Sequence, residues 1–88
     1  MRIDQLIWTE RNVEHVSRHG IYPEEVEDVL FNPPLDARRG EREDAFLVFG
    51  KTDAGRRLLI VLAPRERNAW YVITARDVDR IEKRRMKR

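Results

Sequence analysis

The chain has 88 residues and no cysteine, which fits one small domain and excludes disulfide bridges, thiolate zinc sites and cysteine nucleophiles. It has no apolar run long enough to span a membrane and no signal peptide, so we expect a cytoplasmic protein. The net charge of +2 conceals an asymmetry: residues 1–44 carry 6 bases and 11 acids, whereas residues 45–88 carry 12 bases and 5 acids. The basic second half predicts contact with a polyanion, and RNA fits best.

The first part of the chain predicts one strand and two helices. Residues 4–8 (DQLIW) form a short apolar run that is typical of a strand. A helix is expected to begin near Glu10 and to end at Gly20, because glycine readily takes the left-handed conformation that ends helices. Pro23 is well suited to begin a second helix, which the Asn-Pro-Pro sequence at residues 32–34 ends.

The second part predicts three strands after a polar loop at residues 35–43. The strands are residues 45–49, 58–62 and 70–74, which are apolar and separated by turns rich in glycine, proline and asparagine. The continuous apolar sequence of residues 58–62 (LLIVL) indicates a central strand that is buried on both faces.

A last helix is expected after the third of these strands. Thr74 and Asp77 have the spacing of a helix cap, and the helix would continue through Ile81 into the basic tail. The element order is then β-α-α-β-β-β-α. This order predicts a single α+β domain over residues 1–88, in which helices pack on an antiparallel three-stranded meander joined by an N-terminal strand.

Two histidines, His15 and His19, are four residues apart and are expected on one face of the first helix. This spacing suits a metal ion, but Glu14 is the only other ligand nearby, and the more ordinary interpretation is a histidine that packs at the helix end and interacts with its dipole. Proton transfer and phosphate contact are further alternatives.

Basic residues cluster where the predicted strands end, and together they predict an RNA-binding groove. They are Lys51, Arg56, Arg57, Arg65, Arg67 and Arg76. Tyr71, Trp70 and Phe49 supply rings on which bases can stack. The alternative is that the rings belong to the core and the arginines are solvated turn residues.

The predicted start of the last helix is a second candidate anion site, because free backbone N–H groups favour a negative charge there. Arg76 beside such a site can stabilise charge that develops on a phosphorane, or it can simply pair with a nearby acid. Arg84 and Arg85 in the tail either add attraction to phosphates or complement the dipole of the helix end.

Several of these residues occur in the order found in the BrnT-type ribonuclease toxins. The chain contains W-x3-N-x2-H-x3-H-G from Trp8, then G-x4-G-R from Gly50, then T-A-R-D-x4-E from Thr74. The chain therefore resembles this family over nearly its whole length.

The resemblance implies a RelE-like α+β fold and RNA cleavage by transphosphorylation, without a metal or other cofactor. Arg76 and Arg57 would stabilise the phosphate, and His15, His19 or a tyrosine would move protons. The resemblance also implies a cognate antitoxin that covers the toxin in a hetero-oligomer and that alone contacts operator DNA.

One position departs from the family pattern. Family members commonly end in E-R-x-x-Y, whereas this chain has Met86 where the aromatic residue is expected. Methionine has neither ring nor hydroxyl, which favours a second interpretation, a non-catalytic module of the same fold that binds RNA or protein. A metal-binding domain that uses the two histidines is a third.

Overall fold

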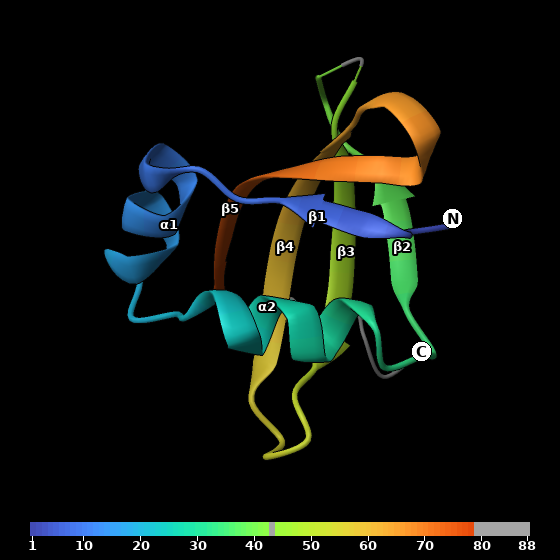
Figure 1. The fold of residues 1–88 in the computed structure, drawn as a ribbon. Helices are drawn as coiled ribbons and strands as arrows, with labels where there is room; N and C mark the ends of the chain where they lie inside the picture. The colour runs from blue at the N-terminus through green and yellow to red at the C-terminus, as the bar shows by residue number, and fades with distance from the viewer. Residues whose placement is uncertain (43, 79–88) are drawn as a thin grey trace.

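The computed structural model describes residues 1–42 and 44–78, and within them the fold is α+β (Figure 1). Five strands form one sheet of order β1-β5-β4-β3-β2, in which β1 runs parallel to β5 and the other neighbours are antiparallel. The strands are β1 (Gln5–Ile7), β2 (Asp36–Arg39), β3 (Phe46–Lys51), β4 (Arg57–Pro64) and β5 (Ala69–Asp77), and the helices are α1 (Glu10–Ser17) and α2 (Pro23–Leu30). The predicted meander is present as β3, β4 and β5.

Both helices begin where the sequence predicts. The Thr9 side chain accepts a hydrogen bond from the Asn12 backbone N–H at 3.2 Å, and Asn12 Oδ1 accepts one from the Thr9 backbone N–H at 2.7 Å. This reciprocal arrangement satisfies two donors that a helix start would otherwise leave without partners. Pro23 begins α2, as expected.

The main core lies between the helices and one face of the sheet, and α2 crosses that face over β3 and β4 (Figure 1). Leu58, Ile60 and Leu62 of β4 are fully buried there. Leu59 points to the opposite face, where it packs with Phe49 and a neighbouring valine in a smaller cluster. The prediction of a central strand at residues 58–62 is therefore confirmed, and its burial on both faces is confirmed in part, because Val61 on the second face is only partly buried.

The close packing of α2 on β3 depends on Gly50. A Cβ atom at this position would lie 2.6 Å from Cγ1 of the buried Val29. Gly50 and Lys51 were expected in a turn, but they pair with Leu58 and Arg57 as the last residues of β3. The glycine is therefore a site of close approach inside a strand.

The predicted loop at residues 35–43 is partly wrong, because residues Asp36–Arg39 form the edge strand β2. The guanidinium of Arg38 lies 5.4 Å from the ring centre of Phe49, and that of Arg39 lies 5.1 Å from that of Phe46. Cation–π contacts on β3 thus support a strand whose own sequence is polar.

The helix cap predicted at Thr74 is also wrong. Strand β5 continues through this position to Asp77, and Arg76 and Asp77 pair with Leu59 and Leu58 of β4. Pairing and packing beside the central strand β4 stabilise the extended conformation more than the local capping pattern stabilises a helix start. Val78, also predicted in this helix, is not helical, and residues 79–88 lie outside the described residues.

Asn12 attaches α1 to the edge of the sheet. Its Nδ2 donates to the backbone oxygen of Ile7 at 2.9 Å and to that of Val72 at 3.0 Å. The side chain is 1% exposed, and both of its amide protons are used. These bonds join β1, α1 and β5 beyond the point where β1 ends.

We expect Asn12→Asp to lower the free energy of unfolding by about 2–4 kcal/mol, because a carboxylate has nearly the same shape but would face two buried carbonyl oxygens without a donor. Urea denaturation measures this change. Glu14→Gln on the exposed side of α1 is the matched control and should change stability by less than about 0.5 kcal/mol. An equally small effect of Asn12→Asp would contradict the role assigned to the amide.

Candidate functional site

A groove of about 390 Å³ lies between α1, the β2–β3 loop and the ends of β4 and β5. Helix α1 supplies Arg11, Asn12 and His15, and the β2–β3 loop supplies Arg42 and Asp44. The remaining lining residues are Ala63 of β4, Arg65 just after β4, and Tyr71, Ile73 and Thr74 of β5. The Asn12 amide bonds hold α1 at this edge, so they also fix the helical wall of the groove.

The floor of the groove depends on an irregularity in β5. Val72 and Ala75 are both fully buried in the helix-side core, although they are three residues apart. The pairing with β4 shifts between Val61 and Leu62, which accommodates one extra residue in β5. Ile73 and Thr74 therefore both face the groove, as expected for a β-bulge, a feature often found beside functional sites.

The groove has a positive character. Three arginines line it, whereas Asp44 is the one carboxylate among its lining residues. Within the described part of the chain, none of the three arginines forms an ion pair. A concave surface of this charge attracts anions, and guanidinium groups match phosphate oxygens particularly well.

The structure brings some of the predicted site residues together in this groove. His15, Arg65 and Tyr71 line it, and the guanidinium carbon of Arg65 lies 5.3 Å from the Tyr71 ring centre. Sequence reasoning missed Arg11 and Arg42. A signal for Arg11 was present, because Arg11 and His15 are four residues apart on α1 and share a face of the helix.

Lys51 and Arg57 lie at the other end of the sheet. They pair across β3 and β4 and line a separate depression of about 330 Å³ beside Asp36. Arg57 and Ala63 are separated along β4 by about 20 Å, at roughly 3.3 Å per residue. The basic strand ends therefore do not form the single groove that the sequence predicted.

The other predicted residues lie around the groove or outside the described part of the chain. Arg76 shares a face of β5 with Thr74, and its Nη1 is 3.3 Å from the backbone oxygen of Asp77. Arg67 is in the β4–β5 turn with a positive φ of 58°. Arg84 and Arg85 lie outside the described residues.

The rings of the two histidines lie close together, with their centres 5.8 Å apart. His15 of α1 lines the groove, whereas His19 does not, because α1 ends at Ser17 and not at Gly20 as predicted, so His19 lies two residues beyond the helix. Among residues 1–42 and 44–78, no group of three or more histidine, aspartate and glutamate side chains is arranged to hold a metal ion.

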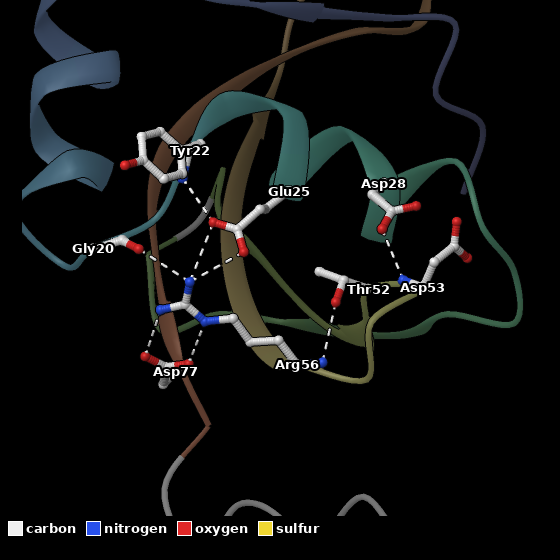
Figure 2. A network of polar contacts seen from close by, with 8 residues as sticks. All are labelled: Gly20, Tyr22, Glu25, Asp28, Thr52, Asp53, Arg56 and Asp77. Atoms are coloured by element: carbon white, nitrogen blue, oxygen red, sulfur yellow. Dashed lines mark hydrogen bonds and ion pairs between the residues drawn. The ribbon is translucent and has the colours of Figure 1, made fainter.

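Arg56 has a different environment from the groove arginines (Figure 2). Its Nε and Nη2 donate to the two carboxylate oxygens of Asp77 at 2.8 and 2.9 Å. Its Nη1 donates to the backbone oxygen of Gly20 at 3.0 Å and to Glu25 Oε2 at 3.1 Å. Two carboxylates raise the pKa of the guanidinium, so Arg56 stays charged.

The Arg56 contacts join four parts of the fold, namely the α1–α2 connection, the start of α2, the turn that leads into β4 and the end of β5 (Figure 2). Asp28 reinforces this attachment by accepting the backbone N–H of Asp53, in the β3–β4 turn, at 2.8 Å. The geometry therefore supports a structural role for Arg56 in place of the predicted contact with RNA.

Comparisons with known proteins agree with the fold. Residues 8–82 match the model of the family described as ribonuclease toxin, BrnT, of type II toxin–antitoxin systems. The crystal structure of the Brucella abortus ribonuclease toxin BrnT superposes with a TM-score of 0.69 at 18% sequence identity, over 86% of this chain and 97% of that chain. No curated protein matches the chain significantly.

We expect Arg56→Lys to lower the free energy of unfolding by about 1–3 kcal/mol, because an ammonium cannot bind Asp77 through two parallel bonds while also reaching Glu25. Arg18→Lys, in an exposed ion pair with Glu14, is the control and should cost less than about 0.5 kcal/mol. Unfolding in urea and RNA affinity are measured on the same samples. Unchanged stability with weakened RNA binding would restore the RNA-contact role for Arg56.

Proposed function

Because the chain belongs to the BrnT family of ribonuclease toxins of type II toxin–antitoxin systems, we propose that it is an endoribonuclease whose active site is the groove beside α1. The observation that carries this proposal is the placement of three arginines and His15 around one concave surface. The whole chain acts as one domain in this proposal.

The reaction that suits these side chains is transphosphorylation. The RNA 2′-oxygen bonds to the adjacent phosphorus and gives its proton to a base, while the bond to the 5′-oxygen breaks and that oxygen takes up a proton. The products are a 2′,3′-cyclic phosphate and a 5′-hydroxyl. The groove arginines stabilise the extra negative charge of the phosphorane, and His15 is the groove residue best suited to transfer protons.

The donor set favours catalysis without a metal ion. A site for Mg²⁺ usually presents carboxylates and phosphates to the ion, whereas this groove offers Asp44 among three guanidinium groups. The cations of the protein thus do the charge stabilisation that a metal would otherwise provide. Arg76, two residues beyond Thr74 on the same face of β5, is proposed to contact the RNA backbone where it leaves the groove.

The family also supports proposals about partners and location. We expect a cognate antitoxin to neutralise the toxin in a hetero-oligomer by placing an acidic surface over the groove, and to contact operator DNA itself. None of the helices in residues 1–42 and 44–78 is long and apolar enough to cross a bilayer. We place the protein in the cytoplasm, where its RNA substrate is found.

The alternative function is a non-catalytic module that uses the same groove to bind RNA or protein. Met86 favours it, because this position usually carries an aromatic residue in the family. Binding of RNA without cleavage, with an affinity that falls steeply as salt increases, would support this alternative over the enzyme.

The purified protein should cleave RNA in the presence of EDTA and leave 2′,3′-cyclic phosphate ends, which mass spectrometry of the products identifies. Arg42→Ala and His15→Ala should each lower the rate about 100-fold or more, because each removes a group that acts on the reacting phosphate. Arg57→Ala, at the opposite end of the sheet, is the matched arginine control and should stay within about 3-fold of the unchanged protein, well below the effect expected of a catalytic group. The reverse pattern would move the active site to the depression lined by Lys51 and Arg57.

Expression of the protein alone should cause RNA breakdown and growth arrest, and Arg76→Ala should abolish both, because this arginine is proposed to hold the RNA backbone at the end of the groove. Growth curves and total RNA profiles measure the two effects, with soluble protein levels compared between the variants. Arrest that persists with Arg76→Ala, or harmless expression of well-folded unaltered protein, would contradict the proposal.

A further inference from the structure

Arg65 and Tyr71 at one end of the groove form a stacked pair that phosphate binding does not require. Tyr71 of β5 lies opposite Ala63 of β4, and both line the groove. Ala63 has a small side chain and is itself buried beside the tyrosine, which is partly exposed. The guanidinium of Arg65 lies over the Tyr71 ring, with 5.3 Å between its central carbon and the ring centre.

The backbone fixes Arg65 over the ring. Its Nη1 donates to the oxygen of Pro64 at 2.9 Å, and its backbone N–H donates to Ala69 at 2.8 Å, closing the β4–β5 turn. Arg67 and Asn68 in this turn both have a φ of 58°, and Asn68 accepts the backbone N–H of Asp4 at 2.9 Å. The turn is thus held in a tight left-handed conformation against the chain that leads into β1.

Tyr71 differs from its neighbours in the strand. Trp70 and Val72 are buried in the helix-side core, whereas Tyr71 is partly exposed on the groove side. Arg65 also differs from Arg56, because it lies over a ring and forms no ion pair within the described residues, whereas Arg56 is held by two carboxylates. Because the guanidinium lies over the ring, its outer face can continue the stack, and its edge carries hydrogen-bond donors.

We infer that Arg65 and Tyr71 form a nucleobase-binding subsite, in which one base of the bound RNA stacks against this pair while Arg11 and Arg42 hold phosphates. Bases stack on aromatic and guanidinium planes, and the donors of the arginine edge suit the O6 and N7 acceptors of guanine. This inference rests on the proposed function in one respect, namely that the groove takes RNA. Arg65 and Tyr71 then determine which base is bound, whereas other groove residues carry out the cleavage.

The test combines removal of the Tyr71 ring with removal of one RNA base at a time. Binding is measured by fluorescence anisotropy with short 2′-O-methyl RNA oligonucleotides, which cannot undergo transphosphorylation, and with versions that carry one abasic residue at each position in turn. Tyr71→Leu should weaken binding of the intact oligonucleotide roughly 5- to 100-fold, the range expected for one stacked base. At one position, the abasic residue should weaken binding of the unchanged protein by a similar factor and have no further effect on Tyr71→Leu.

Two further variants serve as controls. Tyr71→Phe keeps the ring and should retain the affinity of the unchanged protein, which separates stacking from the hydroxyl and from folding. Arg42→Ala should weaken binding of every oligonucleotide alike, abasic versions included. The inference is overturned if Tyr71→Leu leaves binding unchanged, or if it weakens intact and abasic oligonucleotides equally at all positions.

The readout also separates this inference from the proposed function. Coupling between Tyr71 and one base in a protein that does not cleave RNA would establish the subsite and reject the enzyme. Cleavage without any coupling would keep the enzyme and reject the subsite. If neither Arg42→Ala nor Tyr71→Leu affects binding, RNA does not occupy the groove, and both proposals fail.

Discussion

The side-chain amide of Asn12 is the interaction on which the groove depends. It is buried, and its two protons reach the backbone oxygens of Ile7 and Val72, so it ties α1 to β1 and β5 at once. Strand β1 pairs with β5 over only three residues, so the chain leaves the sheet before α1 begins. Without the amide bonds, nothing in the strand pairing would place Arg11 and His15 beside the face of β5 that forms the floor.

Much of the fold could be predicted because it follows from local pattern. Proline and capping residues mark the helix starts, and continuous apolar runs mark the strands. The wrong predictions concern residues whose secondary structure is set by contacts with segments distant in the sequence. Residues Asp36–Arg39 are polar and become a strand because β3 offers hydrogen bonds and two phenylalanine rings. Thr74 has the spacing of a helix cap but pairs with Val61 as part of β5.

The candidate site was less predictable than the fold, because antiparallel strands place successive turns at opposite ends of the sheet. Arg57 begins β4 and Arg65 follows its end, so the two cannot line one groove even though they are only eight positions apart. His15 could be predicted because its helix face follows from spacing alone. Arg42 could not, because its place beside the groove depends on the conformation of the β2–β3 loop.

The charge asymmetry of the sequence does not correspond directly to the charge that the folded protein presents at its groove. Arg56 belongs to the basic half, but Glu25 of the acidic half and Asp77 occupy its donors, so it contributes little to an attractive surface. Conversely, two of the three groove arginines, Arg11 and Arg42, come from the acidic half. An arginine that carboxylates reach joins elements of the fold, whereas one that they do not reach remains available to a polyanion. Its position in the acidic or the basic half of the sequence does not determine which of these occurs.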